Sequence, residues 1–363
     1  MNFVGRAGRA PRPFPSRSSG GFQMRIAIIG LGMAAAPHVA ALRALGDRAE
    51  VAAAFSPSPE RRAAFARAHG LPAAERLDDV LDDPSVAAVL VLTPPSTHLD
   101  LVRRAAAAGK HVLLEKPLEI DLDRARALVE AADEAGVRLG VVLQNRFRAS
   151  IEEGVRLVGE GTLGAVVSVS ARLSNWRPQS YYDEAGRGTR ARDGGGVLLT
   201  QGIHTLDAMI ALAGLPDEVT GYATTSRAHR METEDVAHAA MRFADGALGA
   251  VSATTAAYPG FPDAIELFGT HGSLRIDSSG ADVVLADGRA WRTEDGAAGN
   301  GTGADPMAFS SLHHQRVLAD FLDAVAQGRA PRVSGREALK VHALIEAILA
   351  SSDASGAPRR VGA

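Results

Sequence analysis

A short glycine-containing segment is the first part of the sequence whose residue types and spacing indicate binding chemistry. Residues 30–35 read Gly-Leu-Gly-Met-Ala-Ala, a G-x-G-x-x-A pattern that follows a β-branched run and precedes an Ala-rich one. Gly30 permits a tight turn, Gly32 lets the backbone approach a pyrophosphate, and Ala35 keeps the next helix close to the sheet. With Met33, these residues lead into a helix N-terminus, whose amides attract phosphate. The context predicts a dinucleotide site, and the alternative is a glycine turn without a ligand.

The end of the second expected strand bears on which dinucleotide binds. An acidic residue at this position would accept hydrogen bonds from the adenosine ribose and favour NAD. The sequence has Ser56 here, with Arg61 and Arg62 shortly after it. A small hydroxyl beside guanidinium groups leaves room for a 2′-phosphate, which favours NADP over NAD as the cofactor. The alternative is that both arginines only solvate the exposed side of a helix.

Four further strings occur downstream in a fixed order. They are Thr93-Pro94-Pro95-Ser96-Thr97-His98, Glu115-Lys116-Pro117, Gly194-Gly195-Gly196 and Gly202-Ile203-His204-Thr205-Leu206-Asp207. Together with the glycine segment, the set resembles the Gfo/Idh/MocA family, which includes glucose–fructose oxidoreductases and inositol dehydrogenases. The resemblance runs from about residue 24 to residue 352. Its specific part is the E-K-P tripeptide after a strand, combined with the G-x-H-x-x-D string that follows.

The resemblance implies an NAD(P)-dependent oxidoreductase acting on a secondary alcohol or ketone of a sugar, sugar acid or cyclic polyol. In such proteins the T-P-P-x-x-H loop passes under the dinucleotide, and the E-K-P tripeptide ends a strand beside the nicotinamide. The additional cofactor-binding residues that the resemblance implies are Thr93, Pro94, Pro95, His98, Glu115 and Lys116. From its own position, His98 is expected to act as a structural cap at the start of its helix.

Lys116 and His204 are the predicted catalytic residues. Moving a hydride from C–OH to nicotinamide requires removal of the hydroxyl proton, and histidine suits this because its ordinary pKa lies near working pH. A lysine cation at the same oxygen stabilises the developing alkoxide. The alternatives are that Lys116 is a surface lysine in an ion pair, and that His204 is a helix histidine packed against Asp207.

Thr200 departs from the family pattern. Many members have an acid four residues before the histidine, and a threonine there cannot hold a negative charge. His204 then lacks the carboxylate that would raise its pKa. Three readings stay open: a different substrate subclass, catalysis by Lys116 and His204 alone, or a nucleotide-binding regulator that has no turnover. A tightly held cofactor recycled within one site is a further possibility.

Aromatic and arginine side chains gather in the segment before the glycine triplet. Aromatic rings stack on sugar faces, and arginines bind carboxylate or phosphate, so an acidic sugar is one expected substrate. The predicted substrate-binding residues are Lys116, Asn145, Arg146, Trp176, Arg187, Thr200 and His204. The alternative for Trp176 is packing of the loop against the sheet. Without cysteine or an H-E-x-x-H string, no metal site is expected.

Two patterns of apolar residues predict the elements that position these side chains. Up to Leu143, short apolar runs alternate with Ala-rich stretches, as in a doubly wound parallel Rossmann sheet. Its expected strands are 25–30, 50–55, 86–92, 111–115 and 137–143, and its helices 34–45, 59–69, 99–108 and 122–135. After Gln144 a two-residue period predicts a mostly antiparallel open sheet in an α+β domain. Its expected strands are 166–174, 218–226, 235–243, 248–257, 264–270 and 272–277, with helices near 151–157, 198–213, 312–327 and 335–351 and a mobile loop within 279–305.

These patterns predict a disordered extension over 1–23, a Rossmann domain over 24–143, a substrate-binding domain over 144–352 and a flexible tail over 353–363. The net charge is −3 and basic residues are scattered, which argues against nucleic-acid binding. No apolar run is long enough to cross a bilayer, so a cytoplasmic protein is expected. One face of the second sheet is a candidate interface for a homodimer or homotetramer.

Overall fold

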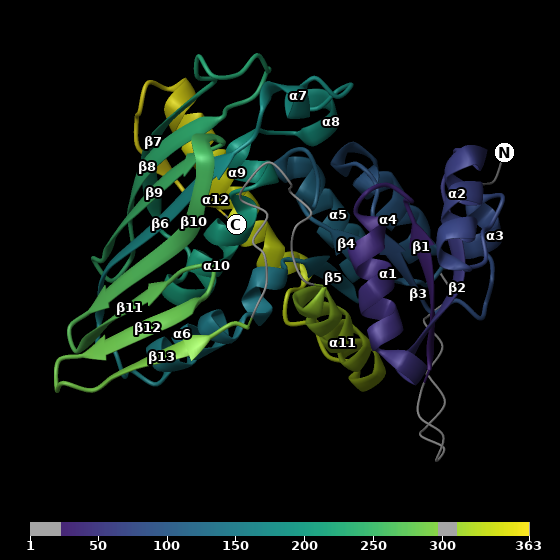
Figure 1. Ribbon diagram of the computed structural model, residues 1–363, viewed down its shortest axis with the longest axis horizontal. Helices are drawn as coiled ribbons and strands as arrows, with labels where there is room; N and C mark the ends of the chain where they lie inside the picture. The colour runs from purple at the N-terminus through teal and green to yellow at the C-terminus, as the bar shows by residue number, and fades with distance from the viewer. Residues whose placement is uncertain (1–22, 297–310, 363) are drawn as a thin grey trace, which may run out of the picture. The chain divides into compact units, whose positions relative to one another are not determined.

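The computed structural model describes residues 23–296 and 311–362, which form two compact units (Figure 1). Of the described residues, the N-terminal unit comprises 23–119, 123–142 and 314–336. The C-terminal unit comprises 120–122, 143–296, 311–313 and 337–362. The predicted extension over residues 1–23 lies outside the described residues except for Gln23, which is exposed.

Five of the described strands form the parallel sheet of the N-terminal unit, in the order β2-β1-β3-β4-β5, as the alternating pattern predicted. These strands are β1 (Met24–Ile29), β2 (Ala49–Phe55), β3 (Ala88–Val91), β4 (His111–Glu115) and β5 (Leu139–Val142). The associated helices are α1 (Ala35–Ala44), α2 (Pro59–His69), α3 (Leu77–Leu81), α4 (His98–Ala107) and α5 (Leu122–Glu134), with the 3-10 turns η1 (Gly46–Arg48) and η2 (Pro95–Thr97). Strands β3 and β5 are buried along their whole length, which explains their continuous apolar runs.

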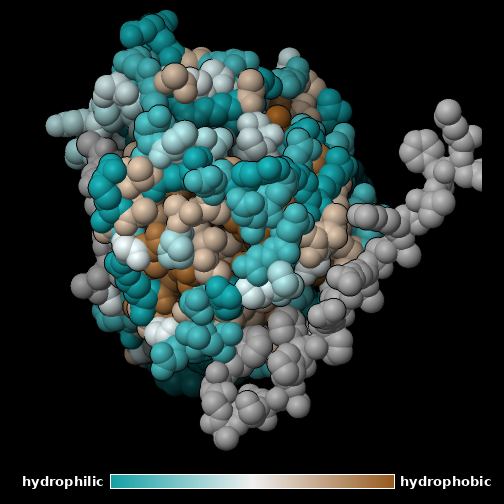
Figure 2. Space-filling model, turned by 90° about the vertical axis from the view of Figure 1, so that its right-hand side faces the viewer, coloured by the Kyte–Doolittle hydropathy of each residue, from teal (hydrophilic) through white to brown (hydrophobic). Residues whose placement is uncertain are grey.

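Local sequence sets the ends of α2. Ser58 accepts a hydrogen bond from the Arg61 amide at 3.1 Å, and Pro59 occupies the first turn, where its missing N–H loses nothing. Gly70 ends the helix with φ +63°. The side seen in Figure 2, toward α2 and α3 of Figure 1, is mostly hydrophilic around a smaller apolar group. Helix α2 contributes to the hydrophilic part of this surface, because it buries Phe65 and exposes most of its polar residues.

The N-terminal unit also contains α11 (Leu312–Gln327), apart from its first two residues. This differs from the predicted boundary, which placed 312–327 in the second domain. The amide of Val141 donates to the carbonyl of Val333 at 2.9 Å, and Asp323 of α11 pairs with Arg48 at 2.6 Å. Phe321 is buried where a side chain on Gly140 would have to sit, so the helix extends the Rossmann core.

Nine strands within the described part of the C-terminal unit form one sheet, in the order β13-β12-β11-β10-β6-β9-β8-β7-β14. Most neighbours are antiparallel, but β6 and β9 run parallel, so the sheet is mixed. The strands are β6 (Val166–Trp176), β7 (Glu218–Thr224), β8 (Val236–Arg242), β9 (Leu248–Thr254), β10 (Ala256–Gly269), β11 (Gly272–Ile276), β12 (Gly280–Leu285), β13 (Ala290–Glu294) and β14 (Arg359–Arg360).

Helices cover one face of this sheet, and Figure 1 shows the other face open. Helix α10 packs on β6 and β10, and α6 packs on β11, β12 and β13. Alternate residues of the strands point to each face, so Val169 and Leu173 are buried whereas Tyr222 and Leu248 are exposed. The remaining elements are η3 (Gln144–Phe147), α6 (Ala149–Gly159), α7 (Gln179–Tyr182), α8 (Arg190–Asp193), α9 (Val197–Thr200), α10 (Ile203–Ala213) and α12 (Gly335–Asp353).

Three segments of this unit differ from the expectation. The segment 279–305, predicted to hold a mobile loop, contains the β12–β13 hairpin, and its residues 297–305 lie outside the described part. The predicted helix 198–213 is two helices, because the chain bends by 50° before Ile203. The predicted flexible tail includes β14, whose residues pair with edge strand β7 and satisfy backbone groups there.

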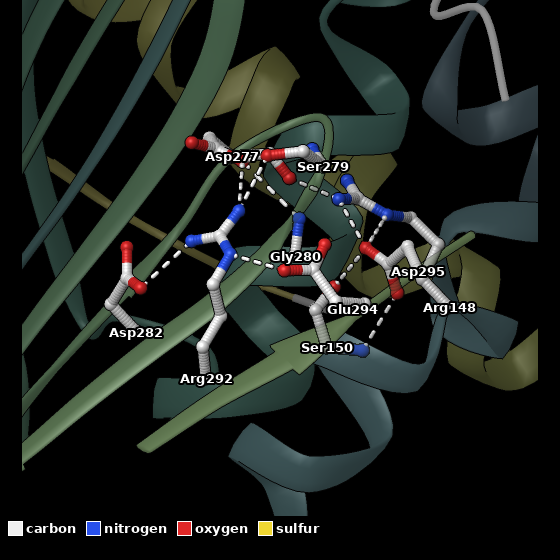
Figure 3. A network of polar contacts seen from close by, with 9 residues as sticks. All are labelled: Arg148, Ser150, Asp277, Ser279, Gly280, Asp282, Arg292, Glu294 and Asp295. Atoms are coloured by element: carbon white, nitrogen blue, oxygen red, sulfur yellow. Dashed lines mark hydrogen bonds and ion pairs between the residues drawn. The ribbon is translucent and has the colours of Figure 1, made fainter. Parts of the chain in front are cut away.

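A polar network fastens α6 to the β12–β13 hairpin (Figure 3). Asp295, 8% exposed, binds the Arg148 guanidinium at 2.6 Å and accepts the backbone amide of Ser150 at 2.8 Å. Arg292 joins Asp282 and Glu294, each at 2.7 Å. Arg148 therefore has its principal carboxylate partner within this network.

Candidate functional site

The glycine segment has the geometry that a pyrophosphate requires. Gly30 has φ +104°, and a Cβ there would lie 2.7 Å from the carbonyl carbon of Leu92, so only glycine fits. A Cβ on Gly32 would meet nothing within 4 Å, which leaves the backbone open to a ligand. Among the described residues, no side chain caps the start of α1 at Ala34, so its first amides can receive an anion. Ala35 is buried and Met33 is 62% exposed. This cradle fits a dinucleotide pyrophosphate.

The end of β2 presents a hydroxyl rather than a carboxylate. Ser56 is buried, and the Arg62 guanidinium donates to its carbonyl oxygen at 2.7 Å. Arg61 contributes its amide to the Ser58 cap, and its side chain is exposed. Arg62 therefore stabilises the turn after β2 through the Ser56 carbonyl, whereas the Arg61 side chain is exposed to solvent.

His98 has a role different from the predicted cofactor contact. Its side chain is 0% exposed, with Nε2 at 2.8 Å from the Thr93 carbonyl and Nδ1 at 3.1 Å from the carbonyls of Pro117 and Leu118. Burial lowers the pKa of His98, although these carbonyls favour the protonated form. The histidine therefore ties the loop after β3 to the segment after Lys116, and both of its ring nitrogens lie at backbone carbonyls. Thr93 and Pro94–Pro95 lie at that loop, between β3 and α4.

Glu115 faces inward, in a cluster that the sequence did not reveal. Its Oε1 accepts a hydrogen bond from His38 Nε2 at 2.7 Å, and the His38 and His314 rings meet edge to face at 4.9 Å. Burial alone would raise the pKa of Glu115, but the His38 bond and the neighbouring positive charges lower it to about 2. These three side chains have ligand atoms within 4.8 Å of one another, where the sequence had led us to expect no metal-ligand group. We assign His38 and His314 the role of holding the Glu115 side chain in place. Glu115 directly precedes half-buried Lys116.

The glycine triplet lets backbones approach closely before the histidine helix. A Cβ on Gly196 would lie 1.8 Å from the Glu234 carbonyl oxygen, and one on Gly194 would lie 2.4 Å from the backbone of Ile120. The buried Glu234 carboxylate accepts the amides of Gly196 at 3.0 Å and of Leu198 at 3.1 Å. This carboxylate caps α9 and fixes its direction.

His204 stands in the first turn of α10 and Thr200 ends α9, so the bend separates them. The two residues therefore do not share the single helix predicted over 198–213. Thr200 Oγ1 donates to the Gly196 carbonyl at 2.7 Å, four residues earlier in its own helix. His204 is half-buried.

Arg146, which was predicted to contact the substrate, is bound by acidic side chains of its own unit. Its guanidinium forms a bidentate pair with Asp207, through Nε to Oδ2 at 2.8 Å and Nη2 to Oδ1 at 2.7 Å. A further hydrogen bond reaches Glu337 at 3.1 Å. Arg146 is 7% exposed and Asp207 is 0% exposed, so the pair is structural. Asn145, next to it in η3, is half-buried.

The predicted aromatic contacts form a packed cluster. Trp176 ends β6, and its ring meets Tyr258 edge to face at 5.4 Å. The Arg187 guanidinium lies 4.2 Å from the centre of the Tyr181 ring and pairs with Glu184. Arg187 therefore already has an acidic partner, which weakens its predicted role in binding an acidic sugar.

Sequence reasoning missed a polar group on the face of the sheet that α10 covers. Asp263 of β10 accepts a hydrogen bond from Thr205 at 2.8 Å, directly beside His204 in the chain. Asn175 of β6 is 5% exposed on the neighbouring strand. A signal was present, since half-buried Asp263 falls on the same two-residue period as buried Ile265 and Leu267.

Comparison with known proteins agrees with this arrangement. Residues 24–143 match an oxidoreductase family with an NAD-binding Rossmann fold, and residues 152–275 match the GFO/IDH/MocA C-terminal domain. The chain belongs to the Gfo/Idh/MocA family. It is accordingly an NAD(P)-dependent oxidoreductase by family, as the ordered motifs indicated.

Named relatives of this Gfo/Idh/MocA protein are sugar-metabolising enzymes. The 1,5-anhydro-D-fructose reductase of Ensifer adhaerens is 32% identical over 241 residues, covering 65% of this chain and 70% of the relative. D-xylose 1-dehydrogenase (NADP(+)) 2 of Haloferax volcanii is 30% identical over 315 residues, covering 85% and 91%. The WlbA dehydrogenase from Bordetella pertussis, solved with NADH and UDP-GlcNAcA, is 29% identical with TM-score 0.80, covering 94% of this chain and 99% of that one.

Within the described ranges, no single helix combines the length and the apolar character needed to cross a membrane, although the bent pair 190–200 and 203–213 meets both together.

Proposed function

We propose that this protein oxidises or reduces one carbon of a sugar or cyclic polyol, with Lys116 and His204 acting on the substrate oxygen. The observation that carries the proposal is the glycine cradle at Gly30 and Gly32 before the uncapped α1, in a chain that retains both the E-K-P lysine and the G-x-H-x-x-D histidine. A bound nicotinamide supplies hydride acceptance or donation. Lys116 belongs to the N-terminal unit and His204 to the C-terminal unit, so the proposal requires both to reach one substrate.

The proposed residues have complementary tasks. In the oxidative direction, the C–H bond breaks as hydride leaves, and the hydroxyl proton passes to the His204 imidazole while the C=O bond forms. The Lys116 ammonium stabilises the negative charge that develops on the oxygen. In the reductive direction, imidazolium returns the proton as the carbon receives hydride. Thr200 takes no proton, because its hydroxyl donates to the Gly196 carbonyl.

The direct test is incubation of the purified protein with NAD⁺ or NADP⁺ and a panel of sugars and inositols, following reduced-cofactor absorbance. Relatives named for 1,5-anhydro-D-fructose, D-xylose and myo-inositol define the first panel. Turnover above a cofactor-only control supports the proposal. Tight dinucleotide binding without turnover on any compound, in either direction, would favour the alternative of a non-catalytic regulator.

We further propose that NADP(H) is preferred, because Ser56 stands where an acid would bind the ribose hydroxyls. Replacing Ser56 by Asp should shift the ratio of kcat/KM for NADP⁺ over NAD⁺ toward NAD⁺ by about tenfold or more, since a carboxylate repels the 2′-phosphate. The measurement is steady-state kinetics with each cofactor at saturating substrate. Ser58→Ala, two residues on, is the control for damage to the turn. An unchanged ratio in Ser56→Asp would refute the assignment.

We also propose that the open face of the C-terminal sheet mediates a homodimer or homotetramer. Small side chains such as Ala240 and Ala250 line a shallow depression there, and Tyr222, Leu248 and Phe268 are exposed on the same face. Ala250→Arg should convert the assembly to monomers, because a guanidinium would be buried without a partner. Light scattering after gel filtration measures the mass. Ala63→Arg on exposed α2 is the matched control, and an unchanged mass in Ala250→Arg would contradict the proposal.

A further inference from the structure

We propose that Asp263 and Asn175 bind hydroxyl groups of the substrate and select an uncharged polyhydroxylated compound over a sugar acid. This inference rests on the proposed function and adds two substrate-binding residues and a substrate class to it. All the contacts that carry it lie within the C-terminal unit.

Asp263 has one carboxylate oxygen in use and one to spare. Oδ2 accepts the Thr205 hydroxyl at 2.8 Å, which fixes the carboxylate to the first turn of α10, next to His204 in the chain. Oδ1 is buried and has no hydrogen-bond partner among the residues that the structure describes. A buried acceptor without a donor is unfavourable for the folded protein, and a ligand that supplies the donor would satisfy it.

Asn175 presents a second acceptor on the adjacent strand. The register pairs Phe261 with Ser174 and Ala264 with Arg172, with a shift between these two pairs, so Asp263 lies in the irregular part of β10 that runs along this end of β6. Asn175 Oδ1 is also buried, and within the described ranges no donor reaches it. Two neighbouring acceptors without donors match a ligand with several hydroxyl groups, because each hydroxyl can donate one hydrogen bond.

The surrounding charges favour this reading over a carboxylate-bearing substrate. The charged groups that face Asp263 are Arg148 and Arg177. Arg148 binds Asp295 in the network of Figure 3, and Arg177 Nη1 donates to the Trp176 carbonyl at 2.8 Å. Burial raises the pKa of Asp263 to about 6, despite the Thr205 bond and these two arginines. Above that pH, Asp263 is an anion that attracts hydroxyl donors and repels a substrate carboxylate.

The arginines first expected to bind an acidic sugar are occupied elsewhere. Arg146 is paired with Asp207 and Glu337, and Arg187 with Glu184. Asp263 is therefore a charged side chain next to the histidine turn that retains unused hydrogen-bonding capacity.

The experiment compares wild type, Asp263→Asn and Asn175→Ala, with Asp282→Asn as the matched control on an exposed part of the same sheet. With myo-inositol and D-xylose as neutral probes and D-glucuronate as the acidic one, both site variants should raise KM for the preferred neutral probe about tenfold or more, with a smaller change in kcat. Wild-type KM should rise as the pH falls below about 6, and this rise should be absent in Asp263→Asn. The control should match wild type.

Stability and binding measurements keep the inference testable without turnover. Because burial of the ionised carboxylate opposes folding, unliganded Asp263→Asn at pH 8 should melt no lower than wild type, whereas a merely structural residue would melt lower when replaced. Calorimetric binding of myo-inositol or D-xylose to the NADP⁺-loaded protein should weaken in both variants. If wild type turns nothing over yet shows this weakening, the proposed function fails and the inference stands. Unweakened binding of neutral probes, or tighter wild-type binding of D-glucuronate, overturns the inference.

Discussion

Replacing Lys116 by Met should lower kcat by about two to four orders of magnitude while dinucleotide affinity stays within a few fold. The expected loss arises because the ammonium stabilises charge that develops on the substrate oxygen only as hydride moves, so its removal raises the barrier without affecting the glycine cradle. The anchoring of Glu115 by His38 at 2.7 Å should keep the strand end in place in the variant. Steady-state kinetics measure turnover, and fluorescence titration with NADPH measures cofactor binding.

The controls separate charge from packing. His204→Gln should show a loss of similar size, because glutamine cannot exchange a proton with the substrate. Lys340→Met, at a lysine paired with Glu337, and His271→Gln, at an exposed turn, repeat both substitutions away from the proposed chemistry. Near-normal kcat in Lys116→Met or His204→Gln would end the assignment. A loss of NADPH binding equal to the loss of kcat would instead identify a cofactor-holding role.

Local signals correctly predicted the strand, turn and helix around the glycine segment. The G-x-G-x-x-A string lies between a strand and a helix, and the structure adds that Gly30 packs against the backbone of Leu92. Such a turn depends on neighbours in the chain and on one adjacent strand, so its sequence determines it closely. His98 shows the limit of this reasoning. Its position at a helix start was visible, but its bonds to the carbonyls of Pro117 and Leu118 depend on packing twenty residues away.

The substrate end was harder to predict because contacts distant in the chain decide it. From the sequence, Arg146 was expected to bind substrate. In the folded chain it pairs with Asp207 and Glu337, which lie far from it in the sequence. Thr200 and His204 were expected on one continuous helix, whereas the chain bends between α9 and α10. Asp263 was missed because the prolines at 259 and 262 indicate a break, whereas β10 continues through both of them.

The domain boundary was missed for a related reason. The amphipathic pattern of α11 predicts that one side of the helix is buried, but it does not indicate which of the two sheets the helix packs against. The contacts of Phe321 with the site at Gly140, and of Asp323 with Arg48, assign the helix to the N-terminal unit. The return of the chain to the N-terminal unit at residues 314–336 has no local signal in the sequence.

Asp207→Ala should destabilise the C-terminal unit by about 3–5 kcal/mol, because it leaves the Arg146 guanidinium buried with Glu337 as its remaining acidic partner. Urea unfolding followed by circular dichroism at pH 7.5 measures the change. The double variant Asp207→Leu with Arg146→Leu should recover much of the loss, because apolar side chains of similar volume remove both charges. Asp245→Ala, in the exposed turn before β9, provides a control that should stay within about 0.5 kcal/mol of wild type.

Asp207→Ala also tests whether Asp207, the last residue of the G-x-H-x-x-D string, has a structural or a catalytic role. Asp207 is 0% exposed and both its oxygens are bound by Arg146, so it has no lone proton-accepting atom directed to solvent. At a temperature where the variant is still folded, kcat per folded molecule should therefore remain within about tenfold of wild type, far above that of His204→Gln. A loss as large as that of His204→Gln in fully folded Asp207→Ala would place Asp207 in the chemistry. If Asp207→Ala is as stable as wild type, the prediction that the buried Arg146–Asp207 pair supports the fold is wrong.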